Sequence, residues 1–239
     1  MNPSATTWAV IPASGIGRRM RSETPKQYLM FQGKTILEHC LDRLLSHPRI
    51  EAVVVVLNDE DEYWEKLSYR SPKPVITTSG GEERHHSVYQ GVLALQQQGV
   101  TDALVLVHDA VRPLVTHLDL DKVIAAALGH EAGAILATPV TDTLKLQSEI
   151  MEITSTVSRD RLWRALTPQV FHQQPLLRAL TSAIEKNLDI TDDASALEQL
   201  GYRPLLVAGD TDNIKITMPA DLGLAELIWL NQRDQQDDK

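Results

Sequence analysis

Cysteine is almost absent from the sequence, since Cys40 is the only one among 239 residues. A single thiol cannot close a disulfide within the chain. Cys40 shares one helical face with Ile36, Leu37, Leu41 and Leu44, which is typical of a helix that packs on a core. We therefore interpret Cys40 as a core residue and not as a nucleophile.

The sequence also lacks long apolar runs. The first seven residues are polar and show neither the basic nor the apolar segment of a signal peptide, and no apolar run has the length that spans a bilayer. We expect a cytoplasmic protein that binds no membrane. The hydrophobic content of 43% suits a buried core, and no linker rich in proline, glycine or serine divides the chain. Residues 1–239 are therefore expected to form a single domain.

Positive charge is in short supply. The 23 lysine and arginine residues are outnumbered by 32 aspartate and glutamate residues, which gives a formal net charge of -9. General binding to nucleic acid or to anionic membranes calls for extended basic surfaces, so we expect neither as a partner. The eight histidines and the single cysteine show no spacing typical of a metal site. Any phosphate ligand must be held by a local group of residues.

One such group follows the apolar segment at residues 9–12, where Gly15 and Gly17 lie in a short loop. Three basic residues border this loop: Arg18, Arg19 and Lys26. Glycine lets backbone N–H groups approach an anion, and basic side chains add formal charge. The loop lacks the Gly-Lys-Ser/Thr of a P-loop, and Met20 replaces the third glycine of a dinucleotide-binding motif. A tight turn with a solvated basic rim is the remaining alternative.

Apolar segments and helical patterns alternate along the chain. The sequence predicts strands at 9–12, 52–57, 74–77, 103–108 and 133–139, and helices at 35–46, 59–68, 82–98, 118–130, 174–186, 193–200 and 219–230. This alternation predicts an α/β fold, a mostly parallel twisted sheet with helices on both faces. Ligands of such sheets bind at the carboxyl ends of the strands, so the loops there are the candidate site.

Two later loops carry suitable side chains. Gly80 and Gly81 precede a helix whose first turn contains Arg84 and Ser87, a pattern that could hold a base or ribose. A plain helix start, with acidic residues that complement its dipole, is the alternative. Asp109 ends the next strand, and Arg112 follows three residues later. A strand-end carboxylate is a natural Mg²⁺ ligand when phosphates supply further oxygens, and an Asp–Arg pair that closes a turn before Pro113 is a common alternative.

A different pattern occupies residues 141–157. Polar and apolar residues alternate on both sides of a polar stretch at 147–149, which predicts a β-hairpin. An isolated two-stranded ribbon is marginal in water, so we expect an arm at about 139–160 that packs against the same arm of a second subunit. Residues 212–217 are predicted to form a short strand that carries Lys215.

Seven segments occur together in this order: PASGIGRRM (12–20), PKQ (25–27), Gly80 and Gly81 with Arg84 and Ser87, HDAVRP (108–113), LWRALTPQ (162–169), TD (191–192) and DNIK (212–215). Through these segments the chain resembles, over nearly its whole length, the 2-C-methyl-D-erythritol 4-phosphate cytidylyltransferase family of the non-mevalonate isoprenoid pathway. Two small departures are Ser14, where the family more often has alanine, and Glu82, where aspartate is frequent.

The resemblance implies a Rossmann-like nucleotidyltransferase fold and a defined reaction. A phosphate oxygen of 2-C-methyl-D-erythritol 4-phosphate (MEP) would attack the α-phosphorus of CTP in line, and 4-diphosphocytidyl-2-C-methyl-D-erythritol and pyrophosphate would form. By the resemblance, Arg19 and Lys26 are catalytic, and Mg²⁺ or another divalent cation lies near Asp109. The negative charges of both substrates make electrostatic stabilisation the main requirement.

The resemblance also assigns binding residues. Those implied for the nucleotide are Pro12, Ala13, Ser14, Gly15, Gly17, Gly80, Gly81, Glu82, Arg84, Ser87 and Ala110. Those implied for MEP are Asp109, Arg112, Thr143, Arg159, Thr167 and Lys215. A homodimer with exchanged arms is implied, in which Arg159 serves the active site of the partner. Arg18 receives no role.

Three alternatives remain open. A ribitol-phosphate cytidylyltransferase, or another sugar-phosphate nucleotidyltransferase, would share the glycine loop and the segment around Asp109. A nicotinamide-dependent oxidoreductase is disfavoured by Met20. A non-catalytic nucleotide-binding module would leave Lys26, Arg159 and Lys215 without a purpose.

Overall fold

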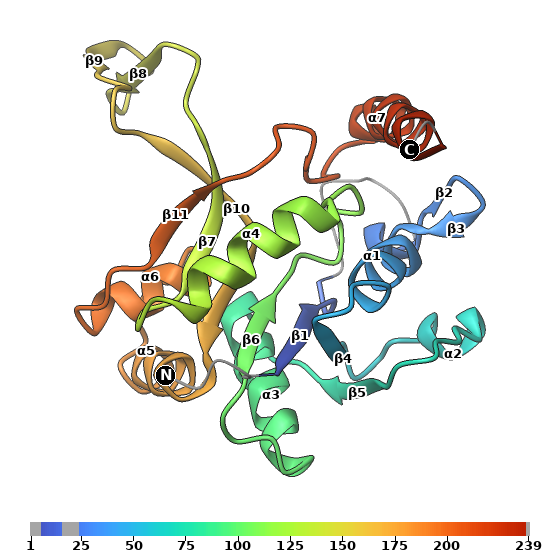
Figure 1. Ribbon diagram of the computed structural model, residues 1–239. Coiled ribbons are helices and arrows are strands. Elements are labelled where there is room, and N and C mark those ends of the chain that lie inside the picture. The colour runs from blue at the N-terminus through green and yellow to red at the C-terminus, as the bar shows by residue number, and fades with distance from the viewer. Residues whose placement is uncertain (1–5, 16–23, 238–239) are drawn as a thin grey trace.

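Seven strands form one sheet in the computed structural model, which describes residues 6–15 and 24–237 (Figure 1). In spatial order the strands are β11 (Leu205–Ala208), β7 (Ala134–Pro139), β10 (Trp163–His172), β6 (Leu104–Val107), β1 (Thr7–Pro12), β4 (Ile50–Leu57) and β5 (Val75–Ser79). All neighbouring pairs are parallel except those of β10, which runs antiparallel to β6 and to β7. The prediction of a mostly parallel sheet is therefore confirmed.

Helices cover both faces of this sheet, as the alternation predicts. The helices of the described chain are α1 (Ile36–Leu45), α2 (Trp64–Leu67), α3 (Arg84–Gln97), α4 (His117–Leu128), α5 (Gln173–Glu185), α6 (Asp193–Gln199) and α7 (Pro219–Asp237). Alternate side chains of β1 point to opposite faces, so Ile11 packs in a cluster with α1 and α4, while Val10 packs in a second cluster with α3, α5 and α6. Cys40 is fully buried in the first cluster, which confirms its interpretation as a core residue.

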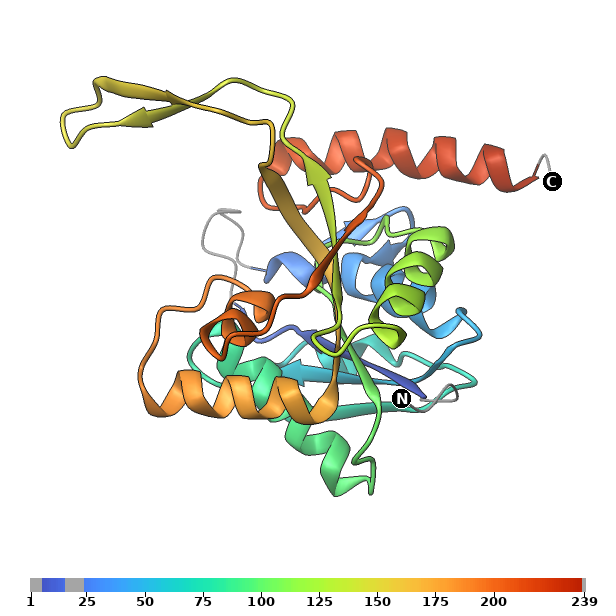
Figure 2. The ribbon, with the colours of Figure 1, turned by 60° about the vertical axis from the view of Figure 1, so that its left-hand side comes forward.

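The long helix α7 lies over one end of the molecule (Figures 1 and 2). Its residues Ala225 and Ile228 pack in a third cluster with Phe31, Leu114 and Ile216. Phe31 belongs to a small hairpin of β2 (Met30–Phe31) and β3 (Lys34–Thr35). Among the described residues, no helix is both long and apolar enough to cross a membrane.

The order in which the strands are added to the sheet reverses between β1 and β6, so this junction is the topological switch point. From β1 the sheet grows through β4 to β5, and the chain then returns to the other side of β1 to form β6. The carboxyl ends of these parallel strands meet at one edge, and the loops that leave them diverge there. This edge is where the fold predicts a ligand site.

Some predicted elements were wrong. The predicted helix at 59–68 is shortened to α2, because the side chains of Asn58 and Asp61 accept hydrogen bonds from the backbone N–H groups of Glu60, Tyr63 and Trp64. Such local bonds compete with helix formation. Residues 212–217 form no strand, and β10 and β11 were not predicted.

A two-stranded ribbon projects from the body where the sequence predicts a hairpin (Figure 2). Strands β8 (Leu144–Gln147) and β9 (Ile153–Val157) pair antiparallel. Several apolar side chains of this ribbon are exposed, including Leu146, Ile150 and Ile153.

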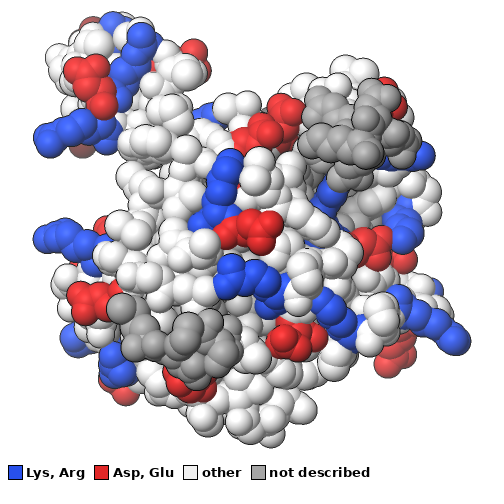
Figure 3. Space-filling view, in the orientation of Figure 1, with Lys and Arg blue, Asp and Glu red and all other residues white. Residues whose placement is uncertain are grey.

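Charged side chains of both signs are mixed over the face shown in Figure 3. The basic side chains of this face therefore lie in small groups among acidic ones.

Candidate active site

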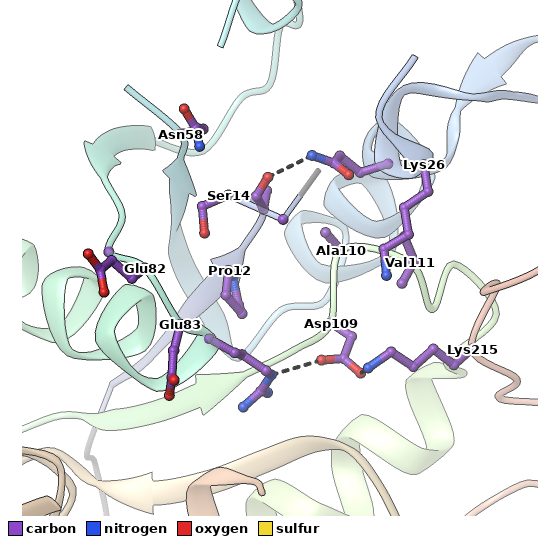
Figure 4. Close-up of a pocket in the computed structure, with 15 residues that line it drawn as sticks. Pro12, Ser14, Lys26, Asn58, Glu82, Glu83, Asp109, Ala110, Val111 and Lys215 are labelled. Carbon is purple, nitrogen blue, oxygen red and sulfur yellow. Dashed lines mark hydrogen bonds and ion pairs between the residues drawn. The ribbon is translucent and has the colours of Figure 1, made fainter. Parts of the chain in front are cut away.

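A pocket of about 490 Å³ lies at the edge of the sheet where β1, β4 and β6 end (Figure 4). Its lining residues come from the ends of these strands, from the start of α3 and from two flanking segments. They are Pro12, Ala13, Ser14, Gly15, Lys26, Gln27, Asn58, Gly81, Glu82, Glu83, Arg84, Asp109, Ala110, Val111 and Lys215. The pocket therefore occupies the topological switch point of the sheet.

Two serines join the loops on either side of the pocket. The hydroxyl oxygens of Ser14 and Ser87 lie 2.8 Å apart, and the Ser87 oxygen also accepts a hydrogen bond from the N–H of Gly81 at 3.3 Å. Since Ser87 donates its own proton to the carbonyl of Glu83, Ser14 must be the donor to Ser87. A Cβ at Gly80 would lie only 2.8 Å from both the Ser14 Cβ and the Ser87 hydroxyl. Only glycine fits between these loops.

A buried amide positions Lys26. The Nε2 of Gln27 donates to the carbonyl of Ala13 at 2.7 Å, and the exposed fraction of Gln27 is 3%. This bond ties the short helical turn Lys26–Tyr28 to the end of β1. Figure 4 shows Lys26 extending along the pocket wall beside Ala110 and Val111, toward Asp109.

Three basic side chains surround the carboxylate of Asp109. Arg84 Nε lies 3.2 Å from Oδ1, while Arg112 Nε and Lys215 Nζ lie 3.2 and 3.0 Å from Oδ2. Burial by itself would raise the pKa of Asp109, but the charges of Arg84, Lys215 and Arg112 hold it well below its usual range. Asp109 is therefore ionised at neutral pH, and the group as a whole carries excess positive charge.

Arg84 contacts a second carboxylate. Its Nη1 lies 2.8 Å from Oδ2 of Asp193, the first residue of α6, whose exposed fraction is 0%. Burial disfavours the guanidinium charge, yet Asp193 and Asp109 together raise the pKa of Arg84 above its ordinary value. Arg84 thus bridges the pocket and α6.

Behind Asp109, a buried chain of hydrogen bonds fixes the backbone. His108 Nε2 lies 2.9 Å from the carbonyl of Arg112, which can only accept, so this nitrogen carries the ring proton. The other ring nitrogen, Nδ1, then accepts from the hydroxyl of Thr167 at 3.1 Å, and this hydroxyl accepts the N–H of Asp109 at 3.0 Å. Complete burial lowers the pKa of His108 to about 4, so the ring is neutral.

Asn213 connects the same region to Lys215. Its side-chain Nδ2 donates to the backbone carbonyl of Thr167 at 2.8 Å, and the backbone carbonyl of Asn213 accepts from Nη1 of Arg112 at 2.7 Å. The N–H of Ile216 donates to the carbonyl of Val111 at 2.9 Å. These bonds to individual partners, rather than a sheet ladder, hold the segment that brings Lys215 to Asp109.

The donor set around Asp109 fits one contact to a divalent cation. A carboxylate has about four lone-pair positions, and the three basic side chains engage three of them. The position left on Oδ1 can hold Mg²⁺ or one of its waters if phosphate oxygens supply the other ligands. A second group, Glu83, His85 and His86, brings ligand atoms within 4.8 Å of one another, but the two rings lie against each other at a 36° tilt, with centroids 4.3 Å apart, and His85 pairs with Glu83 at 3.3 Å.

Comparison with known proteins identifies the family. The family model described as 2-C-methyl-D-erythritol 4-phosphate cytidylyltransferase matches residues 7–231. The chain belongs to this family. The enzyme of that name from Vibrio atlanticus is 48% identical over 227 residues, which cover 95% of this chain and 96% of that protein. The one from Tolumonas auensis is also 48% identical and covers 95% and 98% of the two chains.

Solved structures of the cytidylyltransferase family share the fold. A crystal structure of 4-diphosphocytidyl-2C-methyl-D-erythritol synthase matches with a TM-score of 0.82 and 37% identity, covering 94% of this chain and 99% of that chain. The Francisella tularensis cytidylyltransferase matches with a TM-score of 0.81 and 32% identity, covering 94% and 100%. These likenesses confirm the predicted fold class and the predicted family.

The pocket brings together many of the residues that the sequence singles out. Eleven of them line it: Pro12, Ala13, Ser14, Gly15, Lys26, Gly81, Glu82, Arg84, Asp109, Ala110 and Lys215. Gly80 and Ser87 lie behind the Ser14 loop, and Arg112 and Thr167 are buried behind Asp109. Thr143 and Arg159 belong to the exposed arm and do not line the pocket. Gly17, Arg18 and Arg19 lie outside the described residues.

Sequence reasoning assigned no role to several residues of the site. Gln27, Asn58, Glu83 and Val111 also line the pocket, and Asp193 reaches it through Arg84. Asn58 directly follows β4, so the rule that ligands bind at strand ends could have identified it. Asp193 gave no such signal, because only the folded chain brings α6 to α3.

Proposed function

We propose that this chain transfers the cytidylyl group of CTP to 2-C-methyl-D-erythritol 4-phosphate, forming 4-diphosphocytidyl-2-C-methyl-D-erythritol and pyrophosphate. Membership of the cytidylyltransferase family supports this function, as does the pocket. The observation that carries the proposal is the convergence of Lys26, Arg84 and Lys215 on one pocket beside a glycine-containing loop. Two anionic substrates require this concentration of positive charge.

In the proposed mechanism, the two loops joined by Ser14 and Ser87 hold the nucleotide. The backbone at Gly15 and Gly81 would approach the cytidine and the triphosphate closely, since neither residue has a Cβ. Lys26 would stabilise negative charge on the α-phosphate and the leaving pyrophosphate. We assign the same role to Arg19, on the resemblance alone.

Asp109 and Lys215 would receive MEP. Lys215 can pair with the substrate phosphate, while Asp109 can accept a hydrogen bond from a hydroxyl or contact the cation. When bound, Mg²⁺ would neutralise charge on the triphosphate and polarise its phosphoryl oxygens. Arg112 and Thr167, as part of the support behind Asp109, would contribute to MEP binding mainly by fixing that carboxylate.

The bonds exchanged in the reaction explain why no side-chain nucleophile is needed. An oxygen of the MEP phosphate forms a bond to the α-phosphorus of CTP, and the bond from that phosphorus to the bridging oxygen breaks. The electron pair leaves with pyrophosphate. Because the MEP phosphate is ionised at neutral pH, the chain needs to orient and stabilise the reactants rather than remove a proton.

We further propose that residues 1–239 work as one domain within a cytoplasmic homodimer. Exposed apolar side chains on the β8–β9 ribbon support an interface there, because water disfavours such a surface. Arg159 and Thr143, carried by this arm, would reach the active site of the partner.

The direct test is release of pyrophosphate from CTP and Mg²⁺ with each of two acceptors. We expect release with MEP and none above background with ribitol 5-phosphate, which is the acceptor of the alternative enzyme class. Release with ribitol 5-phosphate alone would replace the proposed substrate. CTP binding without turnover of either acceptor would instead indicate a non-catalytic module.

A further inference from the structure

Asp193 is a buried carboxylate that the proposed mechanism does not use. It has no exposed surface, and its Oδ2 accepts a charge-assisted hydrogen bond from Arg84 Nη1 at 2.8 Å. Burial of a carboxylate is costly unless a partner offsets the loss of solvation. Arg84 is the one basic side chain that the structure pairs with Asp193 among the described residues.

The position of Asp193 is fixed by contacts that do not involve Arg84. Asp192 caps α6 by accepting from the N–H of Ser195 at 2.9 Å, and it also accepts from Nε2 of Gln169 at 2.8 Å. The Oε1 of Gln169 accepts from the N–H of Ala194 at 3.0 Å. Gln169 belongs to β10, in the middle of the sheet, so the sheet holds the start of α6 in place.

Arg84 uses different nitrogens for its two carboxylates. Nε faces Asp109 in the pocket, and Nη1 faces Asp193 away from it. A guanidinium held at two points has a defined orientation, whereas one held only by Asp109 can rotate about that contact. Asp109 is also the group expected to engage the cation or MEP, which would weaken its hold on Arg84.

We propose that Asp193 is a positioning residue that keeps the Arg84 guanidinium at the wall of the nucleotide pocket, independently of what Asp109 binds. The proposal rests on the function proposed above for this pocket. Asp193 touches neither substrate, so it acts only through Arg84. Its loss should weaken CTP binding more than it slows the transfer step.

The test is a four-protein cycle of wild type, Asp193→Asn, Arg84→Gln and the double variant. Asparagine keeps the shape of the side chain and removes its charge. We expect Asp193→Asn to raise the KM for CTP about 10-fold, the scale of one charge-assisted hydrogen bond, and to change kcat less than about 3-fold. In the Arg84→Gln background, Asp193→Asn should add nothing to KM. Asp189→Asn, an exposed charge removed just before α6, is the control and should leave KM unchanged.

Two outcomes would overturn the proposal. One is an Asp193→Asn variant, folded by circular dichroism, whose KM stays within about 2-fold of the wild-type value. The other is a rise in KM that is equally large with and without Arg84. If Asp193→Asn alone does not fold, the KM for CTP of Arg84→Gln is compared with that of the double variant, because neither of these proteins contains an unpaired guanidinium. A higher KM in the double variant would then overturn the proposal. If wild type releases no pyrophosphate, the function fails, and calorimetric CTP titration of the same proteins still tests Asp193.

Discussion

The hydroxyl of Ser14 donates to that of Ser87 across 2.8 Å, and this bond joins the loop after β1 to the first turn of α3. Ser14→Ala removes the donor while leaving the Ser87 bonds to Gly81 and Glu83 in place. One neutral hydrogen bond contributes about 1 kcal/mol, so we expect a rise of about 5-fold in the KM for CTP with little change in kcat.

Steady-state kinetics at saturating MEP measure this effect. Ser71→Ala is a matched control, because Ser71 accepts a backbone hydrogen bond from Lys73 well outside the pocket lining. A Ser14→Ala enzyme that binds CTP as tightly as wild type would show that the two loops keep their spacing without this bond.

The spacing between those loops also makes Gly80 sensitive to a single methyl group. Gly80→Ala would bring a Cβ to 2.8 Å from Ser14 and Ser87, so one of the loops must shift. Overpacking of this kind costs about 1–3 kcal/mol. We expect at least about 10-fold weaker CTP binding by calorimetry.

Gly223→Ala provides the contrast, because no heavy atom lies within 4 Å of the added Cβ on α7. There alanine should stabilise the protein by about 0.5–1 kcal/mol and leave CTP binding unchanged. Equal effects of the two substitutions on CTP affinity would contradict the tight fit at Gly80.

How far the sequence predicts this fold depends on where each segment finds its partners. Residues 52–57 of β4 and all of β6 are continuous apolar runs, so local pattern identifies these strands. Strand β10 contains Thr167, Pro168 and Gln169, and its pairing with β7 shifts register there, so its sequence does not have the pattern of a regular strand.

The same distinction applies to the candidate site. Motifs at the ends of β1 and β6 identify Gly15 and Asp109, because strand ends are predictable places for ligands. Asp193 lies 109 residues from Arg84 along the chain, and no local pattern connects the two. Conversely, the sequence predicts a strand at 212–217, although bonds from Asn213 and Ile216 to single partners hold this segment.

Lys26 is expected to be the most sensitive described residue for the transfer step. Its ammonium group would stabilise charge that increases on the phosphates during transfer. Lys26→Ala should therefore lower kcat/KM by at least about 100-fold, as removal of one preorganised stabilising group does elsewhere. Lys34→Ala removes an equal charge from an exposed pair with Asp42 and should have almost no effect. Near-wild-type activity of Lys26→Ala would restrict this lysine to a structural role.

Arg159 offers a test of the shared active site. If the Arg159 side chain serves the partner, an Arg159→Ala subunit still has an intact pocket, which needs Arg159 from the arm of its partner. A Lys26→Ala subunit can supply that arginine. Each homodimer should be nearly inactive, and purified heterodimers should recover about half of the wild-type activity, because one of the two sites is complete. The control is Arg161→Ala, which changes another exposed arginine of the same segment, and its homodimer should stay active. Heterodimers that remain as inactive as the parents would place Arg159 within its own subunit's chemistry.

The buried His108 ring makes the free energy of unfolding depend on pH in the mildly acidic range. Its pKa is about 4 in the folded chain because burial disfavours the cation, whereas an unfolded histidine has a pKa of about 6.5. Between these values the unfolded chain binds more protons than the folded chain, so stability falls as the pH falls from about 6.5 to about 4. The loss from this one group approaches about 3 kcal/mol and is complete below the folded pKa.

His108→Gln removes the titrating group while offering an amide to the Arg112 carbonyl and the Thr167 hydroxyl. The variant should be less stable than wild type at pH 7.5, and the gap should shrink steadily toward pH 4.5, because only the wild type pays to keep this ring neutral. Urea denaturation at several pH values measures both slopes, with His130→Gln as a control in the half-buried turn after α4. Parallel slopes for wild type and His108→Gln would mean that the His108 ring takes up its proton without unfolding, and that the support behind Asp109 tolerates an imidazolium.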